Sequence, residues 1–148
     1  MSTHIYNKLR EEVQLLTRFL GILDDKQTNC CNISISQCHA LIEIERSQSI
    51  SLIDLSTKLC LDKSTMSRTV NHLVHANLVQ REIDADNRKY ISISLTEEGK
   101  QVCNEINSTM IQMYQEILTL VPEAEQEQLL MGLRIFNEVL QKYDKQKT

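Results

Sequence analysis

One stretch, Ser51 to Leu95, constrains this chain more than any other, because two short helical patterns in it are followed by two strand patterns. The first helix is expected at Ser51 to Leu59, with a buried stripe made of Leu52, Ile53, Leu55 and Leu59. After a tight break, Asp62 suits the N-cap of a second helix, because its carboxylate can accept from the amides of the next turn. The stretch therefore predicts a helix-turn-helix.

The second helix is expected at Lys63 to Ala76, and its two faces differ in character. Apolar residues recur at helical spacing on the inner face: Met66, Val70, Leu73 and Val74. The outer face is polar and holds Ser64, Thr65, Ser67, Arg68, Asn71, His72 and His75. Hydroxyl, Arg and Asn side chains are able to contact phosphates and base edges of DNA. For an isolated helix an ordinary solvated face would be the default interpretation, but the neighbouring elements favour a recognition helix.

Those neighbours are two strands, expected at Leu78 to Ile83 and at Lys89 to Leu95, joined by a turn rich in Asp and Asn. An Arg at the tip of such a ribbon, here Arg88, is able to enter a narrow minor groove. The alternative is a surface Arg paired with Asp84 or Asp86, and both can hold together. Two helices and a ribbon in this order predict a winged helix-turn-helix.

The run DKSTMSRTVNHLVHANLVQRE, followed by DADNRKYISISLTEEGK, resembles the MarR family of bacterial winged-helix regulators. The match is specific over Ser34 to Lys100 and rests on length and pattern in the flanking helices. The resemblance implies a homodimer that regulates transcription and releases DNA when a ligand or an oxidant acts. It places Ser64, Thr65, Ser67, Arg68 and Asn71 on the recognition helix and Arg88 on the wing. The expected DNA contacts are these six together with Lys63, His72 and Lys89.

Length and charge set limits on this interpretation. At 148 residues the chain has the size of a single domain. The net charge of −4 argues against a nucleic-acid binder when taken as a whole. Its distribution does not, because the segment from Lys58 to Tyr90 carries +2 and the remainder −6. The sequence has no apolar run of membrane-spanning length and no secretory segment, so a cytoplasmic protein without a membrane partner is expected.

Long amphipathic helices flank the central stretch. One is expected at Ile5 to Leu23, ending where Asp24 to Asn29 break the pattern. A capping box at Ser34 and Gln37 opens another, to about Arg46. After the wing, Thr96 caps a helix that runs to about Leu120, and a last helix follows at about Glu123 to Tyr143. We expect a mainly α, single MarR-like domain, with dimerisation helices in 1–30 and 100–148 and a DNA-binding lobe in 34–99. A single-chain helical bundle is the alternative.

Three of the five cysteines, Cys30, Cys31 and Cys38, lie within nine positions near a helix N-terminus. That end favours thiolate, and three thiolates suit a soft ion such as As(III) or Sb(III). Zinc would need a fourth ligand, such as His39, and an oxidation switch is a further alternative. The plainer interpretation makes Cys38 a small core residue and the other two incidental. The remaining two, Cys60 and Cys103, are expected to be packing residues.

The predicted function is a DNA-binding regulator, with repression favoured, that binds a pseudo-palindromic operator as a homodimer. No cofactor is required, and the effector is either a thiophilic metalloid or oxidant at the cysteines or a small aromatic or lipophilic ligand in the interhelical cleft. A cysteine enzyme built on Cys38 and His39 lacks a glycine-rich loop and a third group to orient a base, so no enzyme is expected. A winged helix that binds protein instead of DNA is opposed by the basic central segment.

Overall fold

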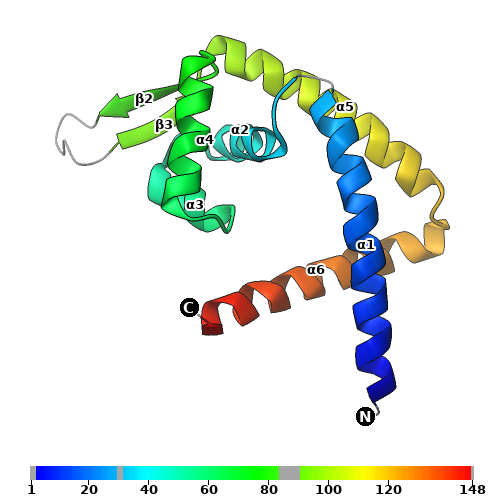
Figure 1. The fold of residues 1–148 in the computed structure, drawn as a ribbon. Helices are drawn as coiled ribbons and strands as arrows, with labels where there is room; N and C mark the ends of the chain where they lie inside the picture. The colour runs from blue at the N-terminus through cyan, green and yellow to red at the C-terminus, as the bar shows by residue number, and fades with distance from the viewer. Residues whose placement is uncertain (1–2, 30–31, 84–90, 148) are drawn as a thin grey trace. The chain divides into compact units, whose positions relative to one another are not determined.

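The computed structural model describes residues 3–29, 32–83 and 91–147; of residues 26–29 and 147 only the backbone is described. Figure 1 shows the elements along the chain, which are mainly helical. In order they are α1 (Thr3–Asn29), α2 (Ile35–Ser47), β1 (Ile50–Ser51), α3 (Leu52–Lys58), α4 (Lys63–His75), β2 (Val79–Ile83), β3 (Ile91–Leu95), α5 (Glu97–Thr119) and α6 (Glu123–Lys147). Contacts divide the chain into two compact units, Met1–Thr109 and Met110–Thr148.

The centre of the first unit is a helix-turn-helix, α3 and α4, packed with α2 and a small antiparallel sheet. The sheet order is β1-β3-β2, with Val79 opposite Leu95 and Ile83 opposite Ile91. The buried core draws apolar residues from every one of these elements: Leu41 and Ile44, Ile50, Leu55, Met66, Val70 and Leu73, Val79 and Ile93. The predicted winged helix-turn-helix is therefore confirmed.

The strand β1 was not predicted, and this is a correction at Ser51. Ile50 and Ser51 pair with Ile93 and Ser92 as a third strand, and helix α3 begins one residue later. Ser51 is instead the N-cap of α3, and its hydroxyl accepts from the amide of Asp54 at 3.1 Å. A two-residue strand is too short to show the alternation by which strands are recognised in a sequence.

Two further expectations on the helices are wrong. Ile53 was expected in the buried stripe of α3, but its side chain is 56% exposed. In a helix of seven residues only the face around Leu55 meets the core, and Ile53 lies two positions, about 200°, away from it. Helix α1 does not end before Asp24 but continues to Asn29. A helical backbone needs no apolar side chains where its surface faces water, so the loss of apolar periodicity did not mark its end.

The turn between α3 and α4 is closed by Cys60, which has a positive φ of 55°. The amide of Cys60 donates to the carbonyl of Thr57 at 3.2 Å, and the amide of Leu61 donates to that of Ser56 at 3.0 Å. This pair of hydrogen bonds is a Schellman cap, which satisfies carbonyls that the helix end leaves open. Asn77 closes α4 in the same way, with a φ of 60°.

The first turn of α5 is joined to the end of α4. The Thr96 hydroxyl donates to the carbonyl of Asn77 at 2.6 Å and accepts from the amide of Gly99 at 3.0 Å, so it caps α5 as predicted. The amide of Thr96 donates to the carbonyl of Leu78 at 3.1 Å. A Cβ on Gly99 would overlap that same carbonyl, so only glycine fits at this position.

Helix α1, the end of α5 and helix α6 leave many large apolar side chains exposed. On α1 these are Ile5, Tyr6, Leu9, Leu15, Leu16, Phe19, Leu20 and Ile22. In the second unit they are Ile111, Tyr114, Leu118, Leu120, Leu129, Leu130, Met131, Leu133, Ile135, Val139, Leu140 and Tyr143. Among the described residues, every helix falls short of the length and apolar character that a membrane span requires.

Candidate nucleic-acid interface

Helix α4 starts at a well-formed cap. The carboxylate of Asp62 accepts from the amide of Thr65 at 2.6 Å. This backbone hydrogen bond, with further help from the Thr65 hydroxyl and the charge of Arg68, holds the pKa of Asp62 below its ordinary value. The cap residue is therefore ionised at neutral pH, and it fixes the first turn, where the hydroxyl side chains lie.

The residues predicted to contact DNA occupy the outer face of α4. Met66, Thr69, Val70 and Leu73 are buried and set the helix orientation. Lys63, Ser64, Arg68, Asn71, His72 and His75 are exposed, and Thr65 and Ser67 are half-buried. The Arg68 guanidinium donates a long hydrogen bond, 3.4 Å, to the Thr65 hydroxyl, which holds it along the helix surface. The structure brings all seven predicted α4 residues to one continuous polar surface, with Val74 half-buried at its edge.

Arg81 on β2 was not among the predicted site residues, although it contacts one of them. Its guanidinium donates to the side-chain carbonyl of Asn71. Arg81 has Ile93 as its partner in the sheet, so its side chain lies on the face that packs toward α4. Strand alternation from Val79 places Arg81 on that face and would have revealed it. The contact links the recognition helix to the base of the wing.

Part of the predicted interface lies outside the described residues. Arg88 and Lys89, predicted for the tip of the wing, belong to residues 84–90, which the structure does not describe. The last described pair of the ribbon is Ile83 with Ile91, and both side chains are exposed. The wing strands are thus in place, and the predicted role of Arg88 stays a prediction.

The described cysteines lie in two different settings. Cys38 and Cys103 are fully buried, and the Cys103 thiol donates to the carbonyl of Leu41 at 3.7 Å. The pKa of Cys103 is raised to about 12, mainly by burial and to a smaller extent by the nearby Glu45 and Cys38. The prediction that Cys103 packs in the core is confirmed. The same prediction for Cys60 is wrong, because Cys60 is exposed in the helix-turn-helix turn.

The predicted three-thiol cluster is described only at Cys38, since Cys30 and Cys31 lie outside the described residues. Cys38 is buried, while the neighbouring His39 is exposed, so the two side chains do not share one surface. Within residues 3–29, 32–83 and 91–147, no three His, Cys, Asp or Glu side chains form a group suited to a metal ion.

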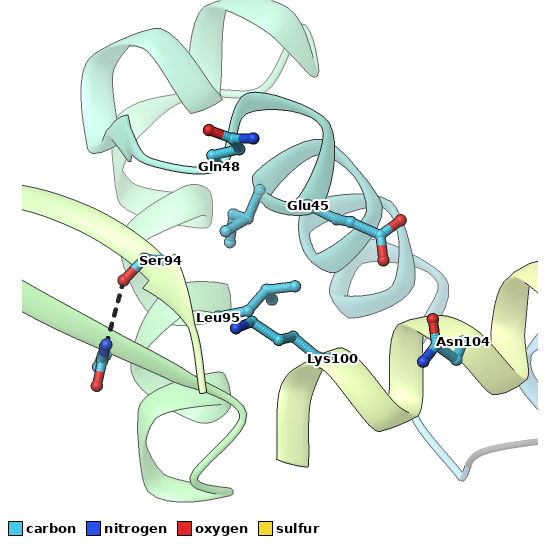
Figure 2. A pocket seen from close by; sticks show the side chains of 8 residues that line it. Glu45, Gln48, Ser94, Leu95, Lys100 and Asn104 are labelled. Atoms are coloured by element: carbon cyan, nitrogen blue, oxygen red, sulfur yellow. Dashed lines mark hydrogen bonds between the residues drawn. The ribbon is translucent and has the colours of Figure 1, made fainter. Parts of the chain in front are cut away.

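A cavity of about 650 Å³ lies behind the wing, within the first unit. Its lining residues come from the end of α2, from β2 and β3, and from the first turns of α5 (Figure 2): Ile44, Glu45, Gln48, Gln80, Ser94, Leu95, Lys100 and Asn104. The set holds one acid, one base, three amides, one hydroxyl and two apolar side chains. None of the described residues of the predicted interface, which exclude Arg88 and Lys89, is among the lining residues.

The combination of a buried helix-turn-helix, a polar outer face on α4 and a β-ribbon defines a winged helix-turn-helix protein. Residues 33–91 match the sequence model of the MarR family. Among curated proteins, no sequence matches this chain. Among solved structures, the transcriptional regulator SlyA superposes with a TM-score of 0.83 at 21% identity, covering 95% of this chain and 99% of SlyA.

Two further structural matches contain DNA. A mutant of E. coli MarR in complex with operator DNA has a TM-score of 0.76 at 18% identity, covering 88% of this chain and 96% of that one. A mutant of S. aureus MepR bound to an oligodeoxyribonucleotide has a TM-score of 0.62 at 21% identity, covering 95% and 99%. Residues 33–91 are thus similar to the MarR family, and the chain shares the winged helix-turn-helix fold of these solved structures. The MarR family that residues 33–91 resemble is one of transcriptional regulators and not of enzymes, which argues against the cysteine-enzyme alternative.

Proposed function

We propose that the chain is a homodimeric regulator that reads operator DNA through the outer face of α4 and releases it when an effector binds. The observation that carries the proposal is the polar face from Lys63 to His75, with its opposite side fixed in the core. The E. coli MarR and S. aureus MepR matches, both bound to DNA, support it.

The charges of the described residues fit this role. Lys63 and Arg68 on α4 are exposed, and Arg81 is exposed on β2 beside Asn71. Each of these cations can neutralise a phosphate and release a counterion, so affinity should fall steeply with salt. Hydroxyl and amide groups between them, on Ser64, Ser67 and Asn71, are suited to base edges and phosphates. A face of this kind on a chain of net charge −4 confines DNA contact to one side of the lobe.

The exposed apolar faces of α1, the end of α5 and α6 support a dimer. Their large apolar side chains would stay in water in a lone chain, although burying each one stabilises by about 1.5–3 kcal/mol. Pairing with a second copy covers them and sets two recognition helices at a fixed spacing. A two-fold pair of readers requires a pseudo-palindromic operator.

Two kinds of effector remain as proposals. The first is a thiophilic metalloid such as As(III) or Sb(III), or an oxidant, acting at Cys30, Cys31 and Cys38. The second is a small organic ligand, aromatic or lipophilic, bound between the helices. The buried setting of Cys38 favours the second kind, because a core thiol is a poor nucleophile and a poor ligand for an incoming ion.

The DNA-binding part is tested by fluorescence anisotropy with the chain's own upstream region. Arg68→Ala should weaken binding by about 1–3 kcal/mol, or about 5–150-fold, and reduce the salt slope by about one. Arg134→Ala, which removes an exposed Arg from α6, is the matched control and should bind as the parent does. Equal affinity of the two variants, or binding that does not respond to salt, would contradict the proposed interface.

The effector part is tested on the preformed complex with arsenite, peroxide and a panel of aromatic acids. Sensing by thiols predicts release by arsenite or peroxide that is lost in the triple variant Cys30→Ser, Cys31→Ser, Cys38→Ser. Release by arsenite that persists in this variant would exclude the three-thiol site. Release by an aromatic acid in both proteins would support the organic effector.

A further inference from the structure

The cavity behind the wing is built by elements that are far apart in the sequence. Helix α2 supplies Ile44, Glu45 and Gln48, the sheet supplies Gln80, Ser94 and Leu95, and α5 supplies Lys100 and Asn104 (Figure 2). All of them belong to the first unit, so the cavity is a property of one packed body. Its volume, about 650 Å³, lies in the range that small-molecule sites occupy.

The acid in this wall is held in place. Glu45 is half-buried, and its carboxylate accepts from the side-chain amide of Asn107 at 2.9 Å. That hydrogen bond joins α2 to α5 and removes much of the rotational freedom that the side chain would otherwise lose on binding a ligand. A carboxylate has about four lone-pair sites, so Glu45 keeps acceptor capacity toward the cavity.

The base in the wall is Lys100, whose partner is easily exchanged. Its ammonium pairs with Glu97 at 3.1 Å, and the two side chains are 58% and 83% exposed. Exposed pairs of this kind contribute little, so a carboxylate arriving in the cavity can replace Glu97. In Figure 2 the Lys100 side chain extends beside Leu95 into the space between β3 and α2.

The remaining wall combines hydrogen-bonding groups with a small apolar surface. Gln80 donates to the Ser94 hydroxyl at 3.4 Å across the two wing strands, and Gln48 and Asn104 add two more amides. Ile44 is buried, and Leu95 is half-buried beside it. A ligand that satisfies this wall therefore carries one positive group, one negative group and a short apolar part.

We propose that this cavity binds a free amino acid, or another zwitterion of that size. The ammonium of the ligand lies at Glu45 and the amide of Asn104, toward which the Glu45 carboxylate points in Figure 2, and its carboxylate lies at Lys100. Its side chain packs on Leu95, which is half-buried. A molecule with only one of the two charges leaves either Glu45 or Lys100 without its new partner, so it binds less tightly.

The regulatory consequence rests on the function proposed above. Gln80 lines the cavity, and the next residue, Arg81, holds Asn71 of the recognition helix. A ligand that bridges β2, β3 and α5 changes the position of the wing base, and through Arg81 that of the DNA-reading face. The amino acid would then alter operator affinity in proportion to its preference for one of the two states.

The binding test uses the full chain without DNA, with calorimetry and thermal unfolding in the presence of each standard amino acid at millimolar concentration. At least one should bind. For the best of them, the corresponding decarboxylated amine and deaminated acid should each bind at least about tenfold more weakly. If no amino acid binds, or if the single-charge analogues bind as tightly as the parent amino acid, the proposal is wrong.

Variants assign the two ends of the ligand. Lys100→Met should weaken the amino acid by at least about tenfold and leave the amine analogue unchanged. Glu45→Gln should have the opposite pattern: it should weaken binding of the amino acid and leave binding of the acid analogue unchanged. Glu97→Gln is the matched control, since it removes the exposed partner of Lys100 and should bind the amino acid as tightly as the parent. Unchanged affinity in Lys100→Met, whose side chain is largely exposed and not needed for folding, would overturn the assignment.

The two proposals fail separately. Binding of an amino acid without binding of DNA would support the cavity proposal and contradict the proposed function. A chain that binds DNA in a salt-dependent way but takes up no amino acid keeps the function and loses the cavity proposal. Operator affinity that is identical with and without a bound amino acid would remove only the regulatory consequence.

Discussion

Gly99, in the first turn of α5, lies directly against the main-chain carbonyl of Leu78, at the point where the recognition helix passes into the wing. The same carbonyl accepts from the amide of Thr96. The start of α5 is therefore packed on backbone rather than on side chains. Backbone has no rotamers with which to yield, so this contact is one of the least tolerant in the chain.

Gly99→Ala should destabilise the fold strongly, by about 3 kcal/mol or more, because the new Cβ and the Leu78 carbonyl cannot both keep their places. Urea unfolding followed by circular dichroism measures the effect. Gly132→Ala in α6 is the control, since a Cβ there meets no atom of the described residues within 4 Å. That variant should keep the parent's helix content, and an equal loss in both variants would contradict the packing argument.

Cys60→Gly should stabilise the chain by about 0.5–1 kcal/mol, because Cys60 holds a left-handed backbone that glycine adopts without steric strain. Cys60→Ala is the matched variant, since it removes the sulfur and retains the Cβ, and it should leave stability near that of the parent. Chemical denaturation separates the two. If alanine stabilised as much as glycine, the thiol and not the backbone conformation would be responsible.

Asp62→Asn should make the chain less sensitive to acid. The pKa of Asp62 is lowered in the folded state, so its stabilising effect is present above its ordinary pKa of 3.8 and is lost as the pH falls through the lower, folded-state value. Asparagine is an equally good N-cap without a charge to lose. The two proteins should have similar melting temperatures at pH 7. Below about pH 4 the melting temperature of the variant should become the higher of the two. A gap that is constant with pH would contradict this.

Alkylation should discriminate among the described thiols. Cys60 is exposed, so iodoacetamide should modify it in the folded protein. Cys103 should stay unmodified until the chain unfolds, because burial raises its pKa to about 12 and hides the sulfur. Mass spectrometry of peptides from folded and urea-unfolded samples gives the comparison. Equal modification of Cys103 in both samples would show that the core opens readily.

Negative charges introduced on α6 by substitution should dissociate the proposed dimer. Leu133 and Leu140 are 42% and 45% exposed in the single chain, and the double variant Leu133→Asp, Leu140→Asp would bury two carboxylates in the proposed interface. We expect a monomer at micromolar concentration by light scattering. Gln141→Asp, on the polar side of the same helix, is the control and should stay dimeric. A dimer in both variants would exclude this face of α6.

Much of the fold could be predicted from the sequence because the helices have strong periodic patterns. Asp62 marked the start of α4, the Ser34 capping box marked the start of α2, and both caps are present. The outer face of α4 followed from the position of Met66, Val70 and Leu73, since a buried stripe fixes the opposite side as well.

The features that were missed depend on contacts between distant residues. The strand β1 exists only because β3 pairs with it, and nothing local at Ile50 marks a strand. The contact of Arg81 with Asn71 needs the sheet to be folded back on α4. Cys60 was expected to be a packing residue, whereas in the turn that it closes its side chain is exposed to water. The cavity could not have been predicted, since its walls come from four separate elements.

The hydrogen bond from Thr96 to the carbonyl of Asn77 joins the residue that ends α4 to the one that begins α5. Because this connection is short, a tilt of the long helix α5 also tilts α4, the proposed recognition helix. An effector that acts at the far ends of the proposed dimer would therefore change the spacing of its two recognition helices without any further coupling element.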